Sequence, residues 1–303
     1  MKRIIGILAL SLLTITANAQ DDATKTSNWK FKAIGALTGT HANFKNWNAG
    51  GQNTLSWIAL FNANADYKKG KFSWANNLNL AYGKNRIRTA PWAKTDDIIA
   101  LSSKAGYSIS KVWSAAFLAD FKTQFDLGYD ADQIFRSKFM APGYLILALG
   151  MDYKPNDKFS ALFAPFTSKL TFVNDFTLAN DGAYGVTAGD VYNARGYALR
   201  KEFGGYVKFT YSDELMKNVT FKGKLELFSN YLHNPQNIDV NLQALFNFKI
   251  NKWLQASWSF NMIYDDDINI TVKDENNQVI GFGPRAQIKN VLSIGMSYTF
   301  VDK

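Results

Sequence analysis

Cysteine is absent from the 303 residues of this chain, and histidine occurs only twice. The absence of cysteine excludes disulfides, thiolate metal sites, a cysteine nucleophile and a lipid anchor on cysteine. The mean hydropathy is only −0.19, which argues against a helical membrane protein, because such proteins need runs of about 20 apolar residues. There is no glycine-rich phosphate loop, zinc motif or nucleotide fingerprint, so we expect no cofactor.

Aromatic residues are plentiful, at 15% of the chain, which suits a barrel with aromatic girdles at the two membrane interfaces. The formal net charge is +9. These charges are spread along the sequence rather than clustered, so we expect no nucleic-acid partner. A basic surface suits contact with acidic lipopolysaccharide and membrane lipid.

Residues 1–19 have the pattern of a secretory signal peptide. Two basic residues precede an apolar core at Ile4–Ile15, and Ala17-Asn18-Ala19 forms an A-x-A cleavage site. The apolar core is too short for a membrane-spanning helix. We therefore expect cleavage before Gln20, a periplasmic leader over residues 20–28 and an exported mature protein.

From residue 29 to residue 303 the dominant pattern is alternation of apolar and polar residues. It is clearest over Val219–Ile250, where apolar residues fall at odd positions up to Leu227 and at even positions from Ile238. Period-two alternation predicts a strand with one apolar and one polar face. Two long strands joined by a short break at His233–Gln236 predict a tall hairpin.

The same pattern predicts about twelve strands in all. We expect them at residues 29–37, 55–67, 72–82, 99–107, 113–125, 145–153, 159–172, 203–211, 219–231, 238–250, 254–264 and 288–300. In the seventh, the apolar positions change parity after Pro165, which predicts a β-bulge. Connections after even-numbered strands are short, and most of the others are long, including a loop over residues 84–97.

An even strand number with short turns at one end is typical of outer-membrane barrels. The predicted fold is therefore an all-β, transmembrane, antiparallel up-and-down β-barrel with both termini in the periplasm. Its apolar face would meet lipid and its polar face would line the lumen. Our candidates for the lumen lining are Asp120, Lys122, Lys208, Lys222, Lys224, Glu226, Asp239 and Lys249. Two interpretations stay open: a selective pore, or a lumen filled by mutual salt bridges.

Three segments resemble one known family. They are Asn46-Trp47-Asn48-Ala49-Gly50-Gly51-Gln52-Asn53, the stretch from Leu227 to Val240, and Ile263-Tyr264-Asp265-Asp266-Asp267. Together they are similar to domain-of-unknown-function family 3078 of the Bacteroidota envelope, over about residues 29–300. The resemblance implies an outer-membrane protein and no established activity.

Catalytic and metal-binding signals are weak. Neither His41 nor His233 has a serine within two positions, as a lipase of the outer-membrane type would require, so two loop histidines are the favoured interpretation. Asp265, Asp266 and Asp267 offer oxygen ligands for calcium but lack the spacing of an EF-hand, and a solvated turn is favoured. We predict no enzymatic activity and no metal.

The leading functional hypothesis is a narrow outer-membrane pore or transporter for small polar solutes. The alternative is a structural or accessory barrel that binds another envelope protein. A lipid-modifying or proteolytic barrel that uses one of the two histidines is the less favoured third hypothesis.

Overall fold

The structure is a computed structural model that describes residues 27–43, 52–88, 90–130, 133–189, 198–273 and 278–301. The expected signal peptide and most of the motif that begins at Asn46 lie outside these residues.

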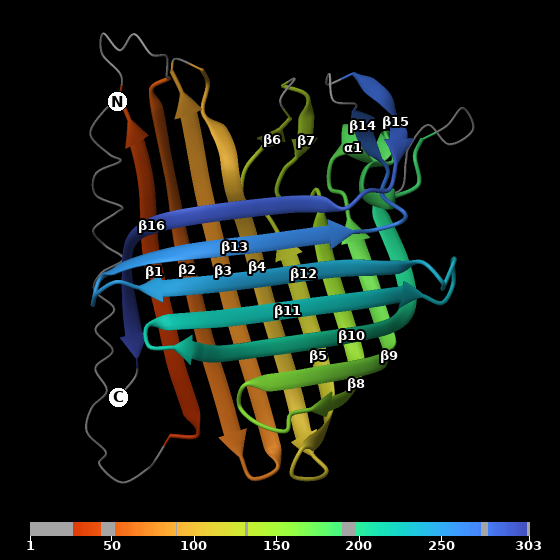
Figure 1. The fold of residues 1–303 in the computed structure, drawn as a ribbon. Coiled ribbons are helices and arrows are strands. Elements are labelled where there is room, and N and C mark those ends of the chain that lie inside the picture. The colour runs from red at the N-terminus through yellow and green to blue at the C-terminus, as the bar shows by residue number, and fades with distance from the viewer. Residues whose placement is uncertain are drawn as a thin grey trace, which may run out of the picture.

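Twelve long strands form one closed antiparallel barrel (Figure 1). They are β1 (Trp29–Ala42), β2 (Thr54–Lys69), β3 (Phe72–Ile87), β4 (Ala93–Ser108), β5 (Trp113–Thr123), β8 (Gly143–Tyr153), β9 (Phe159–Phe172), β10 (Leu199–Met216), β11 (Val219–Asn230), β12 (Ile238–Lys249), β13 (Leu254–Tyr264) and β16 (Gln287–Val301). Neighbours in this order pair with each other, and β16 closes the barrel onto β1. The predicted antiparallel, up-and-down β-barrel of about twelve strands is confirmed.

The connections differ sharply between the two ends of the barrel. Short turns join β2 to β3, β4 to β5, β8 to β9, β10 to β11 and β12 to β13, and both ends of the barrel chain lie on this side. The predicted loop over residues 84–97 is wrong in extent, because β3 and β4 continue to Ile87 and from Ala93. A bulge beside Lys84 keeps the two strands paired there.

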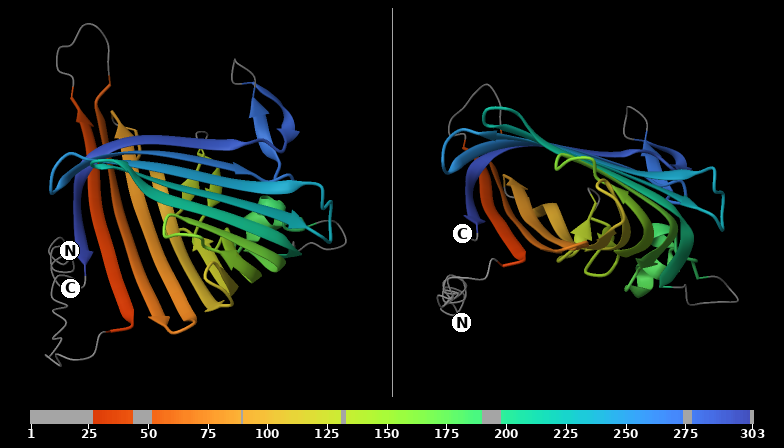
Figure 2. Two further views of the ribbon diagram at one scale, coloured as in Figure 1. Left: turned by 60° about the horizontal axis from the view of Figure 1, so that its bottom comes forward. Right: turned by 90° about the horizontal axis from the view of Figure 1, so that it is seen from below.

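The barrel is flattened, so that two walls of strands cross one another (Figure 2). In this arrangement the β1–β4 wall and the wall of β10–β13 with β16 run in clearly different directions (Figure 1). Strands of a membrane barrel tilt by about 35–45°, and opposite walls therefore cross.

The outer surface is apolar. Large side chains at the outward positions are exposed, for example Leu37 at 53%, Phe117 at 46% and Leu292 at 78%. Aromatic rings form belts at both ends of the barrel. At the end with the short turns, the turn end, Trp29 packs on Phe31, Tyr67 and Trp74, and Trp113 packs on Tyr153. At the end with the long connections, the loop end, Trp57 packs on Tyr82 and Phe203 packs on Tyr231.

The two belts are separated by the thickness of a membrane. Gly39 pairs with Trp57, and Trp29 pairs with Tyr67, so positions 29 and 39 of β1 mark the two belts. About 9–11 residues of a tilted strand cross the hydrocarbon core. An apolar exterior bounded by aromatic belts on a closed barrel is the architecture of an outer-membrane protein.

The predicted bulge at Pro165 is confirmed. The registers of β9 with β8 and with β10 both shift there, between Phe163 and Phe166 and between Ala164 and Thr167. Opposite the bulge, a Cβ atom on Gly150 would lie 2.0 Å from the backbone oxygen of Phe163. The close approach of these two backbones therefore requires glycine at position 150.

The long connections carry small elements of their own. These are β6 (Gly128–Tyr129), β7 (Phe135–Ser137), helix α1 (Phe176–Asn180), the 3₁₀ turn η2 (Ala183–Gly185), β14 (Ile270–Lys273) and β15 (Val279–Gly283). Ala141, Val173, Leu178, Ala179 and Val186 form a small buried core between the β5–β8 and β9–β10 connections. In the described part of the chain, neither helix has the length and apolar character to cross a bilayer.

Asp175 fixes the β9–β10 connection. Its side chain accepts a hydrogen bond from the Leu178 N–H at the start of α1, and it lies 2.6 Å from the Lys138 ammonium of the other connection. The hydrogen bond with Lys138 lowers the pKa of the Asp175 carboxyl. This contribution is therefore complete above the ordinary pKa of aspartate and is lost as the pH falls through the lowered value.

Gly150→Ala should destabilise the barrel by about 1–3 kcal/mol, the usual cost of forcing atoms into a packed site. The matched control is Gly35→Ala in β1, where a Cβ atom meets nothing within 4 Å. Urea unfolding in detergent micelles measures the stability of both variants. Equal midpoints for the two variants would contradict the close approach at the bulge.

Asp175→Ala should lower hydrogen-exchange protection of the Leu178 and Ala179 amides by about 1 kcal/mol, since it removes the helix cap. Asp175→Asn keeps a capping oxygen and loses only the charge attraction to Lys138, so its effect should be smaller. If the two variants exchanged equally fast, the cap would not hold this connection.

Candidate functional site in the barrel interior

Five charged residues meet inside the barrel at mid-height, and we call them the constriction cluster. They are Asp120 and Lys122 of β5, Lys208 of β10, and Lys224 and Glu226 of β11. Strands β8 and β9 separate β5 from β10 in the sheet, so these contacts cross the interior.

Glu226 is the centre of the cluster and is only 5% exposed. One carboxylate oxygen lies 3.2 Å from the Lys224 Nζ, 3.3 Å from the Lys122 Nζ and 2.7 Å from the Asn241 amide nitrogen. The other accepts a hydrogen bond of 2.8 Å from the Tyr206 hydroxyl. A buried carboxylate is tolerated only with such partners, because its desolvation is costly.

Lys208 links Glu226 to the second carboxylate. Its Nζ lies 2.7 Å from Asp120 and 3.7 Å from Glu226. The cluster thus contains three lysines and two carboxylates, a formal excess of one positive charge. A small anion that enters it would gain from this excess, while a cation would meet repulsion.

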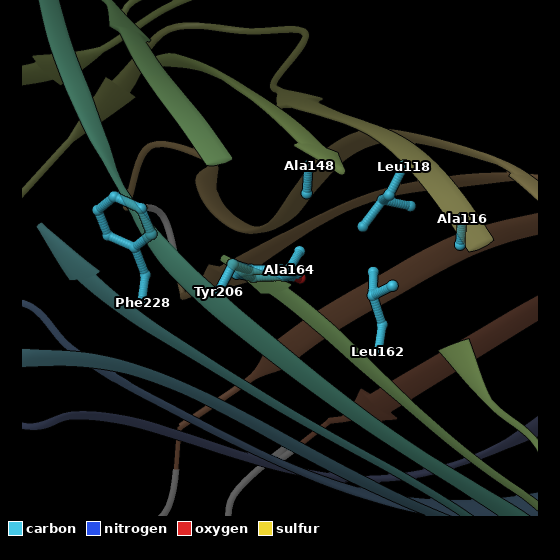
Figure 3. Packing of buried hydrophobic residues seen from close by; sticks show 7 residues of the cluster. All are labelled: Ala116, Leu118, Ala148, Leu162, Ala164, Tyr206 and Phe228. Atoms are coloured by element: carbon cyan, nitrogen blue, oxygen red, sulfur yellow. The ribbon is translucent and has the colours of Figure 1, made fainter. Parts of the chain in front are cut away.

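Figure 3 shows a buried apolar group, which lies beside the constriction cluster because its member Tyr206 donates to Glu226. Leu118 of β5 and Leu162 of β9 face one another, and each is 1% exposed. The remaining members are Ala116, Ala148, Ala164, Tyr206 and Phe228. Because these apolar side chains fill one side of the interior, any passage through the barrel would run along the polar side.

The wall of that polar side is rich in asparagine. The Asn64 amide donates to Asn62, and the Asn77 amide donates to Asn64. Below the constriction cluster, toward the short turns, a cavity of about 170 Å³ lies against this wall. Its charged lining residues are Asp66, Lys104 and Lys208.

A second group of charges, the outer cluster, lies nearer the long loops. Lys169 Nζ lies 2.5 Å from Asp239, 3.2 Å from Asp265 and 3.5 Å from Glu202. Arg200 donates to Glu202 at 2.8 Å and also to Asp267. These ion pairs tie the barrel wall to the connection that follows β13.

The eight predicted lumen candidates divide into three groups. Five form the constriction cluster, and Asp239 belongs to the outer cluster. Lys222 and Lys249 are exposed.

Sequence reasoning missed Lys169, Arg200 and Glu202. The change of parity after Pro165 carried the signal for Lys169, since it places odd positions of β9 on the polar face. Arg200 and Glu202 were missed because β10 begins at Leu199, four residues before the predicted strand.

The three candidate calcium ligands take separate protein partners. Asp265 faces Lys169, Asp267 faces Arg200, and Asp266 accepts from the Tyr264 hydroxyl at 2.8 Å. Among the described residues, no group of three or more histidine or acidic side chains is placed to hold a metal ion.

The two histidines lie at the loop end and on different hairpins. His41 is an exposed residue near the end of β1, and His233 is exposed between β11 and β12. The His233 Nε2 lies 3.2 Å from the Asn234 amide nitrogen.

Glu226→Gln should destabilise the barrel by about 3 kcal/mol, because it leaves three half-buried lysines without their shared counter-charge. Asp157→Asn serves as the control, since Asp157 forms an ion pair in a turn where its side chain is 99% exposed, and it should leave stability unchanged. Urea unfolding of both variants in the same micelles would decide. A Glu226→Gln variant as stable as the control would show that the cluster contributes nothing to folding.

Comparison with known proteins finds a family model that matches part of the chain and several similar barrels. Residues 40–129 match the model of the family described as proteins of unknown function, DUF3078. No curated protein matches the sequence significantly.

Among solved structures, an outer membrane channel from Pseudomonas putida F1 is similar, with 10% identity, a TM-score of 0.40, and coverage of 91% of this chain and 97% of that one. The translocator domain of the autotransporter NalP from Neisseria meningitidis has 11% identity, a TM-score of 0.36, and coverage of 92% and 90%. A Pseudomonas aeruginosa FadL homologue has 11% identity, a TM-score of 0.33, and coverage of 91% and 76%. The chain is an outer-membrane β-barrel whose residues 40–129 match the DUF3078 model, a span that includes the motif at Asn46 and is shorter than the predicted resemblance over residues 29–300.

Proposed function

We propose that this barrel is a narrow pore or transporter for small polar solutes, with a preference for anions. One observation carries the proposal: the constriction cluster on the polar side of the interior has one more lysine than carboxylate. A fixed positive excess inside the barrel raises the local concentration of anions.

The orientation follows from the connections. We place the short turns and both ends of the barrel in the periplasm and the long loops outside, as in barrels inserted from the periplasm. The outer cluster then lies at the external entrance and the cavity beside Lys104 at the periplasmic exit. We propose no catalytic role for either histidine.

The proposal is tested by conductance of the purified protein in planar bilayers. We expect small channels with chloride favoured over potassium. Lys122→Met removes one of three lysines and should abolish the preference, and Asp120→Asn should strengthen it. Lys249→Met, which changes an exposed lysine at the end of β12, is the matched control and should change neither the conductance nor the preference for chloride.

A second function is favoured by the pairing of charges in both clusters and by the folded outer connections. A barrel closed by its own ion pairs would act as an accessory protein that presents its loop core to another envelope protein. Complete absence of conductance from wild type and all three variants, in protein shown to be folded, would reject the pore and favour this alternative. Cross-linking in native membranes would then identify the partner.

A further inference from the structure

The barrel is not sealed along its whole height. Strands β1 and β16 pair only from Lys32–Val301 to Thr38–Gly295. Beyond that point β1 continues to Ala42, while β16 between Gln287 and Ile294 pairs with β13 alone. Figure 1 shows β16 bending away from β1 above their paired halves. We call the space between these two unpaired edges the lateral gap.

Backbone crowding marks the start of the lateral gap. A Cβ atom on Gly295 would lie 2.5 Å from the backbone oxygen of Leu37 and 2.7 Å from the Thr38 Cα. The two strands approach closely at this point and diverge immediately afterwards. The divergence therefore begins within strand β16 itself, at residues that the structure describes.

A cavity of about 390 Å³ occupies the lateral gap. Its lining contains hydroxyl side chains of the inner face, namely Thr38, Thr40, Ser56 and Ser293. It also contains Leu292 and Ile294, which are 78% and 54% exposed on the outer surface. One cavity thus joins the polar interior to the lipid-facing exterior, and its lining includes no charged side chain.

The lateral gap opens at the height of the aromatic belt at the loop end. Trp57, which belongs to that belt, pairs with Gly39, the first residue of β1 beyond the last pair with β16. Strand edges that face hydrocarbon carry unpaired N–H and C=O groups, and each costs several kcal/mol without a partner. A molecule in the gap would therefore be favoured if it offered polar groups to the edges and an apolar chain to the exterior.

The far end of the gap is held by a single lysine. Lys289 of β16 lies 2.5 Å from the Asp96 carboxylate and donates to the Thr95 backbone oxygen of β4 at 2.9 Å. This contact fixes β16 across the β1–β4 wall and keeps the gap bounded on both sides.

We propose that the lateral gap is a binding site for a single-chain amphiphile with an uncharged polar head, such as a monoacylglycerol, that enters from the outer leaflet. The head lies against the hydroxyl groups and the free strand edges, and the chain lies along Leu292 and Ile294. This inference is independent of the polar pore, because it concerns the wall of the barrel rather than the constriction cluster.

The test uses the protein in phosphatidylcholine nanodiscs and a monoacylglycerol with a dibrominated chain, which quenches nearby tryptophan fluorescence. We expect saturable quenching that is weakened in Trp57→Phe, where Trp258 beside Leu292 is still quenched, and unchanged in Trp113→Phe, whose tryptophan lies in the other belt. Non-saturable quenching, or equal loss in the two variants, would overturn the proposal.

The lateral gap can also be closed. Continuing the register would place Thr40 opposite Ser293, and the chain has no other cysteine, so Thr40→Cys with Ser293→Cys offers one defined disulfide. Oxidation of the two cysteines should raise the half-saturating concentration of the monoacylglycerol at least tenfold, and reduction of the disulfide should restore the original value.

A maleimide adduct on Ser293→Cys alone is a second way to block the lateral gap, and it needs no disulfide. The same adduct on Ser102→Cys is the control. Ser102 lines the other cavity. Binding unaffected by the Ser293 adduct would overturn the proposal. Conductance is measured on the same samples, so failure of the lateral site and failure of the pore are distinguishable.

Discussion

The hydrogen-bonding requirement of the backbone in hydrocarbon governs this structure. No water is present in the membrane core to satisfy N–H and C=O groups, so a sheet can cross only when it closes on itself. Twelve strands meet that requirement, except at the lateral gap, by pairing in one antiparallel order from β1 around to β16. The outer face is then free to be apolar, and its side chains remain exposed because lipid, not protein, covers them.

The same closure creates an interior in which polar side chains need partners. Glu226 has five such partners on the four strands β5, β10, β11 and β12, and Lys169 joins β9 to β10, to β12 and to the connection after β13. These contacts bind opposite walls of a flattened barrel to one another. They also set the width and charge of any route through it, so stability and selectivity depend on the same residues.

The period-two pattern was sufficient to predict the strand number, the hairpins and the Pro165 bulge, because each depends on local alternation. Residues such as Asp120 and Glu226 could be assigned to a polar face for the same reason. Their meeting could not be predicted, since it depends on the flattening and on the register across the five strands from β5 to β11. The start of the divergence of β16 from β1 could not be predicted either, because the alternation runs on through Ile294 and Leu292, past the last pair with β1, and breaks only farther along at Asn290 and Val291.

The assignment of lipid-facing and interior faces is tested most directly by single cysteines along β11, in a chain that has none of its own. Lys222→Cys and Lys224→Cys should react with a charged, water-soluble thiol reagent in reconstituted membranes. Phe221→Cys and Leu225→Cys should resist that reagent and react with a lipid-soluble one. Uniform reactivity along the strand, or the reverse alternation, would contradict a membrane-spanning barrel with a polar interior.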